Sequence, residues 1–138
     1  MATLTGSAAI ALNAHKQLSG DLGVRYGTYS MSGALSGDDV VQLVQVFKGE
    51  TVVGVILKVT DLDTDGTPQI TLDIGYGGAA AATVNAFANA SDIGQAGGTA
   101  NAFVPVAFTA DDTIDVRVDT APATGATTGT LQMWLLVA

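Results

Sequence analysis

Hydrophobic and polar residues alternate in short runs over most of the chain after residue 20. The segment TIDVRVDT, residues 113–120, places three β-branched residues on one side and three charged residues on the other. A period of two is the spacing of a β-strand that buries one face. The pattern predicts seven strands, at residues 22–31, 39–47, 51–60, 69–75, 101–109, 113–120 and 130–137.

Turn-forming residues separate these runs, for example in SGALSGDD, DLDTDGTP and TAPATGATTG. Short strands punctuated in this way are typical of an all-β sandwich or barrel. A further strand is possible at residues 84–88, within a long connection at 76–98 that pairs of glycines bracket. We therefore expect an antiparallel β-sandwich of about eight strands, formed as one domain by residues 21–138.

The first twenty residues are rich in alanine, serine and threonine. Small side chains bury little area, and chain ends are easily displaced. We expect residues 1–20 to form an N-terminal arm that becomes ordered against a neighbouring subunit. The segment lacks the basic start and apolar core of a secretory signal, so the expected site of synthesis is a cytoplasm.

The last strand differs from the others because both of its faces are apolar. Trp134 and Leu136 project from the face opposite Leu131, Met133, Leu135 and Val137. If one set fills the core, the other needs cover, which the arm of the same chain or another subunit could supply. Tryptophan is frequent among the residues that dominate binding energy. We expect Trp134 and Leu136 to lie at a subunit interface.

Composition narrows the classes of partner. Hydrophobic residues make up 48% of the 138-residue chain, yet its apolar runs are far shorter than the roughly 18 residues of a membrane-spanning helix. The net charge is −8 and the five basic residues are scattered, whereas nucleic-acid binding requires clustered positive charge. With no cysteine there is no disulfide. We expect no membrane and no nucleic-acid partner.

The segment Asp61-x-Asp63-x-Asp65-Gly66 begins like an EF-hand calcium loop. The twelfth position of such a loop requires a bidentate acid, and here it is Leu72. Both flanks alternate as strands do, while an EF-hand has helical flanks. We interpret the segment as the connection of a β-hairpin between residues 53–59 and 70–74, with no metal requirement.

Residues suited to catalysis are few. His15 is the single histidine, and it lies in the small-residue N-terminal segment with no partner for nucleophilic chemistry. The acidic pairs Asp38–Asp39 and Asp111–Asp112 occur in turn sequences, where aspartate is common for backbone reasons. Aromatic residues, at 6%, are too few to line a sugar groove well. We expect no catalytic residue, no cofactor and no enzymatic activity.

Two segments carry a resemblance to a known group of proteins. The run GDDVVQLVQVFKGETVVGVILKVTDLDTDGTPQITLDIG, residues 37–75, and the closing run FTADDTIDVRVDTAPATGATTGTLQMWLLV, residues 108–137, resemble small virion proteins of tailed bacteriophages. These proteins are of the capsid decoration, or cement, type. The resemblance covers roughly the C-terminal three-quarters of the chain and leaves residues 1–20 and 76–96 unmatched.

The resemblance implies a jelly-roll-like sandwich and a homotrimer that binds the outer surface of the major capsid protein lattice and stabilises the head. It implies a location on the capsid exterior of the virion. An alternative from another class is a head-fibre or tail-appendage module that binds a host-surface carbohydrate. The low aromatic content favours the decoration protein over this alternative.

Overall fold

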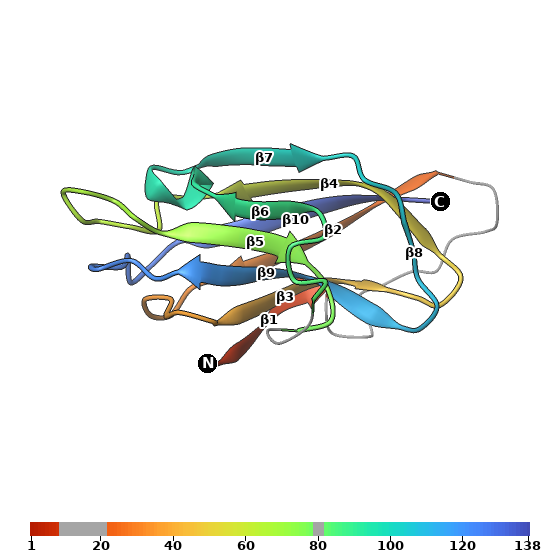
Figure 1. Ribbon diagram of the computed structural model, residues 1–138, viewed down its shortest axis with the longest axis horizontal. Coiled ribbons are helices and arrows are strands. Elements are labelled where there is room, and N and C mark those ends of the chain that lie inside the picture. Colours follow the sequence, from red (N-terminus) through yellow and green to blue (C-terminus); the bar gives the residue numbers. More distant parts are fainter. Residues whose placement is uncertain (9–21, 79–81) are drawn as a thin grey trace.

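Two β-sheets packed face to face make up this computed structural model, which describes residues 1–8, 22–78 and 82–138 (Figure 1). Sheet A has the strand order β1-β3-β9-β5-β6, and its strands are β1 Thr3–Ala8, β3 Val40–Val46, β9 Asp112–Thr120, β5 Thr71–Gly75 and β6 Ala88–Ser91. Sheet B has the order β2-β10-β4-β7, and its strands are β2 Gly23–Ser30, β10 Thr130–Val137, β4 Thr51–Val59 and β7 Gly98–Ala102. The short β8, Val106–Ala107, also pairs with β4, and a 3₁₀ turn spans Ile93–Gln95.

The strand pairs are antiparallel except β1 with β3, which is parallel. Neighbouring strands are mostly far apart in the sequence: β10, for example, lies between β2 and β4. The described residues thus form an all-β sandwich with a jelly-roll-like arrangement, which confirms the predicted fold class. They contain ten strands where about eight were expected.

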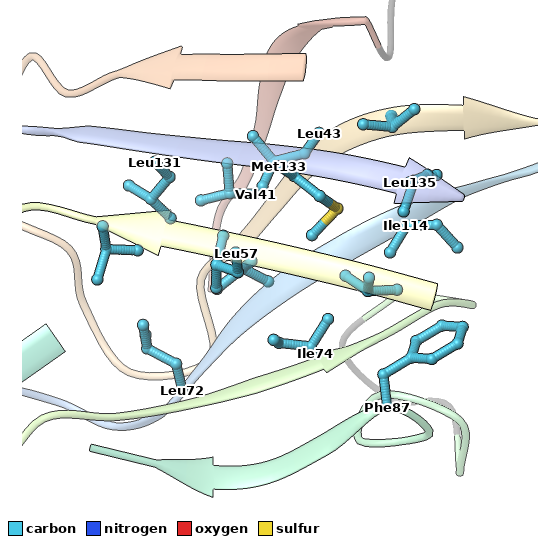
Figure 2. Close-up of a cluster of buried hydrophobic side chains, with 14 of the residues drawn as sticks. Val41, Leu43, Leu57, Leu72, Ile74, Phe87, Ile114, Leu131, Met133 and Leu135 are labelled. Atoms are coloured by element: carbon cyan, nitrogen blue, oxygen red, sulfur yellow. The ribbon is translucent and has the colours of Figure 1, made fainter. Parts of the chain in front are cut away.

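Alternation along the strands fills the space between the sheets. Leucine, isoleucine, valine and methionine side chains from both sheets point toward one another there, and Phe87 closes one end (Figure 2). The central strand β10 buries one face completely, with Leu131, Met133, Leu135 and Val137 fully inaccessible. This set fills the core, and Trp134 and Leu136 lie on the other face.

The predicted hairpin through the Asp61 segment is wrong. Strand β4 belongs to sheet B, where it pairs with β10 and β7, and strand β5 belongs to sheet A, where it pairs with β9 and β6. The connection therefore crosses from one sheet to the other. A period of two indicates that a strand is half-buried, but it carries no information about which strand lies beside it.

Two other elements differ from expectation, and the expected N-terminal arm is described only in part. The strand expected at 101–109 is divided into β7 and β8, with Pro105 between them, a residue that has no backbone N–H to donate. In the long connection the strand lies at Ala88–Ser91 instead of 84–88. Of the expected N-terminal arm, the first eight residues are described, and Thr3–Ala8 forms the edge strand β1; residues 9–20 lie outside the described part.

Strand β2 approaches β3 of the opposite sheet so closely that Gly27 has no room for a side chain. A Cβ atom built on Gly27 would lie 2.1 Å from the carbonyl oxygen of Leu43 and 2.9 Å from the Val44 side chain. Backbone therefore packs nearly against backbone at this side of the sandwich, which only glycine permits.

The Gly27→Ala variant should be strongly destabilised, because its methyl group must push β2 away from β3. Overpacking of this kind costs about 3 kcal/mol. Urea unfolding followed by tryptophan fluorescence measures the change. The matched control is Gly66→Ala, where a Cβ meets no atom within 4 Å. Equal stability of the two variants would contradict the close approach of β2 to β3.

Candidate interaction surface

Trp134 and Leu136 lie on the outer face of sheet B, where both are partly exposed. In the sheet, Trp134 is directly opposite Tyr26 of β2 on one side and Ile56 of β4 on the other. The rings of Trp134 and Tyr26 are in contact, with centroids 5.2 Å apart and planes tilted by 45°. Directly opposite residues share a face of a sheet, so these three side chains form one apolar row.

In its first half, strand β2 presents apolar residues to solvent and a charged residue to the interior. Val24 is 64% exposed and Tyr26 is 44% exposed, while Arg25 between them is buried. The Arg25 guanidinium donates to both carboxylate oxygens of Glu50 and to the backbone carbonyl of Gln45. This arrangement reverses the usual rule that a strand buries its hydrophobic side.

The ion pair makes this reversal tolerable. Glu50 is also buried, and besides Arg25 it accepts the backbone N–H of Phe47, whose ring lies 5.3 Å from the guanidinium carbon. A buried charge is acceptable only when it is paired and hydrogen-bonded. Arg25 can thus occupy the inner side of β2, and the register of that strand then turns Val24 and Tyr26 outward.

Phe103 extends the exposed apolar surface across β4. A Cβ atom built on Gly54 would lie 3.0 Å from the Phe103 ring and 2.8 Å from the Leu136 side chain, so both side chains lie over this glycine. Phe103 is 67% exposed. We define the apolar patch as the neighbouring side chains on this face: Val24, Tyr26, Ile56, Phe103, Trp134 and Leu136.

The rest of this face is polar but carries no negative charge. Next to the apolar patch is a cross-strand row in which Thr28, Gln132, Lys58 and Thr99 lie opposite one another. Gln132 donates to the Tyr26 hydroxyl at 2.9 Å, which joins the row to the patch. In the described strands of sheet B, the outer face holds one lysine and no carboxylate, although the chain has 13 acidic residues.

The outer face of sheet A is charged. Arg117 of β9 forms ion pairs with Asp38 at 3.2 Å, Asp73 at 3.4 Å and Asp119 at 3.5 Å. Asp73 is buried and also accepts the backbone N–H of Ala90, so it ties the edge strand β6 to β5. The two outer faces of the sandwich are therefore chemically distinct.

Asp115 also points to the outer side of sheet A, yet it is buried. Thr83 and Val84 lie over Gly75, the β5 residue opposite Asp115, and so cover this part of the sheet. The Thr113 hydroxyl donates to Oδ1 at 2.6 Å, while the buried Oδ2 has no hydrogen-bond partner within normal distance. Burial raises the pKa of Asp115 to about 7, and the nearby charge of Asp112 adds to the effect.

The Asp61 segment owes its shape to one carboxylate. The Asp63 side chain is buried and accepts the backbone N–H groups of Asp65 at 3.1 Å, Gln69 at 2.8 Å and Ile70 at 2.9 Å. Asp61 in turn accepts the N–H of Asp63. Burial raises the pKa of Asp63, but the three N–H groups outweigh it, so this pKa lies below its ordinary value.

The other acidic candidates anchor backbone. Asp39 accepts the N–H groups of Ala2 and Ser36, and Asp111 accepts that of Lys48. Asp112 accepts the N–H of the residue that follows it. In the ranges that the structure describes, no three His, Cys, Asp or Glu side chains come together as a metal site would require. His15 lies outside those ranges.

The sequence places Trp134 and Leu136 on the face opposite the other apolar set of β10, and their role at a subunit interface stays a prediction; it does not indicate most of the surface around them. The signal in β2 was ambiguous, because Val24 and Tyr26 alternate with Arg25 and Gly27, and the exposed pair would ordinarily be assigned to the core. Phe103 follows the last residue of β7 and precedes Pro105 by two positions, so alternation does not indicate which face its side chain joins. No described helix is long and apolar enough to cross a membrane.

The sequence matches no protein-family model and no curated protein sequence. Among solved structures, a chain in the capsid of Ralstonia phage GP4 is 27% identical, with a TM-score of 0.83 over 99% of this chain and 97% of that one. A chain in the capsid asymmetric unit of cyanophage Pam1 is 24% identical, with a TM-score of 0.71 over 95% and 97%. A chain in the acid-stable capsid of Helicobacter pylori bacteriophage KHP30 is 16% identical, with a TM-score of 0.54 over 86% and 97%. The last two support the fold alone.

The Asp63→Asn variant should melt at a lower temperature at pH 7, because an amide oxygen accepts the three backbone N–H groups less strongly than a carboxylate. The folded-state pKa of Asp63 is lowered, so its contribution is present above pH 4 and lost as the pH falls further. The difference from the wild type should therefore shrink at pH 2.5.

Scanning calorimetry at the two pH values measures this, with Asp65→Asn as the matched control in the same loop. A calcium chelator should leave the wild-type melting temperature unchanged. An equal loss of melting temperature in both variants would contradict the special role of Asp63.

The Asp115→Asn variant should be more stable than the wild type at pH 8. In the unfolded chain Asp115 ionises near pH 4, but in the folded chain only near pH 7, so the wild type loses stability as the pH rises through this window. The loss reaches up to about 4 kcal/mol above pH 7. The substitution by asparagine removes this pH-dependent loss of stability, because the amide does not ionise.

Denaturant titrations from pH 4 to 8 measure this effect, and Asp92→Asn, at an exposed aspartate with no side-chain hydrogen bond in its cap position, is the control. If the pH dependence of the wild type and Asp115→Asn were the same, Asp115 would be ionised in the folded protein throughout this range.

Proposed function

We propose that this chain is a capsid decoration, or cement, protein of a tailed bacteriophage. It binds the outer surface of the lattice of the major capsid protein and stabilises the head. Its working form is a homo-oligomer, and the resemblance in sequence favours a trimer. It acts by binding, and its side chains carry out no reaction.

The observation that carries the proposal is the match over whole chains to components of phage capsids. The match spans 99% of this chain and 97% of the GP4 chain, so the two chains are of similar length. Its capsid therefore includes a separate small chain with this fold. A decoration protein is a small separate chain of this kind that binds to the capsid lattice.

The surface of the molecule supports a binding role. The apolar patch, with Phe103 and Val24 more than 60% exposed, resembles the contiguous apolar surfaces that mark interaction sites on soluble proteins. The charged outer face of sheet A offers a second, different surface. A protein that connects subunits of a lattice requires at least two such surfaces.

The buried carboxylates favour a structural role over a catalytic one. Asp39, Asp63 and Asp73 each hold backbone N–H groups of loops or strand ends, and Glu50 holds Arg25. The oxygen atoms of these carboxylates accept hydrogen bonds within the fold. Such groups make the sandwich rigid, as a component of a pressurised shell needs to be.

The purified protein should bind to heads of the phage that encodes it when these heads lack the chain. Binding should saturate at a copy number comparable to that of the coat protein, and electron cryo-microscopy should show the added density on the outer surface. Decorated heads should retain their DNA at temperatures where bare heads release it.

Density confined to the tail or to a single vertex, with few copies per particle, would instead support the head-fibre or tail-appendage alternative. Density on the inner surface would contradict both. Heads incubated with heat-unfolded protein are the control for non-specific adsorption.

A further inference from the structure

The first half of β2 has its apolar side chains outside the sandwich and its charged side chain inside. Tyr29, near the end of the strand, packs against the core as expected, but before it Arg25 and Gly27 face inward while Val24 and Tyr26 face outward. A strand of a free monomer gains stability by the opposite arrangement, since each apolar side chain moved from water to the interior contributes about 1.5–3 kcal/mol. Sequences depart from such rules mainly where function requires it. The outward apolar side of β2 therefore points to a partner.

The size of the apolar patch fits an interface. Its six side chains are partly or largely exposed, and with aromatic side chains of roughly 200 Å² they present an apolar area on the order of 500 Å². A stable interface buries about 800 Å² on each partner, somewhat more than half of it apolar. Val104, next to Phe103 in the chain, and Leu22, two residues before Val24, are exposed as well.

Charge limits the orientation in which two copies of this chain can meet. Each copy carries a net charge of −8, so most approaches bring carboxylates of both copies together. Contact through the outer face of sheet A would bring the carboxylates of the two copies together, because Asp38 and Asp119 are both exposed there. The described outer face of sheet B has Lys58 and no carboxylate. Two copies can bury this face against each other without that electrostatic cost.

We propose that the outer face of sheet B, centred on the apolar patch, is the surface through which this chain binds a second copy of itself. Trp134 and Tyr26 are the central contacts, and the polar row from Thr28 to Thr99 forms one margin. The proposal rests on the proposed function in one respect: it assigns this face to the oligomer and leaves the rest of the surface to the capsid.

The test uses the free protein in the absence of capsids. Sedimentation equilibrium should show an oligomer at micromolar concentration for the wild type. Val24→Asp places a carboxylate on the patch at a position that is 64% exposed, so the fold is preserved while the oligomer dissociates. Thr127→Asp makes the same charge change at an exposed residue elsewhere and should leave the oligomer intact.

A second pair of variants measures the contact at the centre. Trp134→Ala should raise the dissociation constant at least 30-fold, the effect of a binding hot spot. Lys58→Ala, on the same face but outside the apolar patch, should change it less than threefold. Circular dichroism spectra identical to that of the wild type establish that each variant is folded.

A wild-type protein that stays monomeric at micromolar concentration would overturn the proposal. So would an oligomer that Val24→Asp leaves unchanged; if that variant then failed to bind heads, the face would contact the coat protein and the decoration role would stand. Conversely, an oligomer that is sensitive to Val24→Asp but never binds heads would refute the proposed function and leave this interface in place.

Discussion

The strict alternation of side chains along β10 is the constraint on which the rest of the molecule depends. This strand lies in the middle of sheet B, between β2 and β4, and it buries Leu131, Met133, Leu135 and Val137 completely. A strand cannot turn one residue to the core without turning the next one outward. Once this set fills the core, Trp134 and Leu136 must lie outside, and the strands beside them supply Tyr26, Val24 and Ile56 to the same surface.

The two outer faces of the sandwich differ in their chemistry. On sheet A, Arg117 joins three aspartates, so this face is charged, and the connection before β6 covers Asp115. On sheet B, the buried pair of Arg25 and Glu50 moves the one polar residue of that stretch of β2 inward and leaves an apolar exterior. The sandwich therefore has one charged and one apolar outer face, and partners of different chemistry would fit the two.

Local pattern accounts for what sequence analysis predicted well. The limits of β2, β3, β4, β9 and β10 agree with the expected runs to within a residue or so, because alternation and turn residues are properties of a short stretch of chain. The edge strand β1 was missed, since Thr3–Ala8 has little hydrophobic alternation and owes its strand conformation to pairing with β3. The hairpin predicted at Asp61 is wrong for a related reason: strands that follow one another in the chain need not pair in a sheet, and β4 and β5 belong to different layers.

The sequence by itself determined the all-β class, most of the strands, the two-sided character of the last strand and the absence of a clustered positive charge. All of these follow from the order of residues within windows of ten or fewer. Only the tertiary structure decided which face of β2 is buried, because that depends on Glu50, a residue 25 positions from Arg25 that neutralises it inside the sandwich. It likewise decided that Val24, Tyr26 and Phe103 join Trp134 on one surface, since pairing between distant strands, and no local pattern, brings those side chains together.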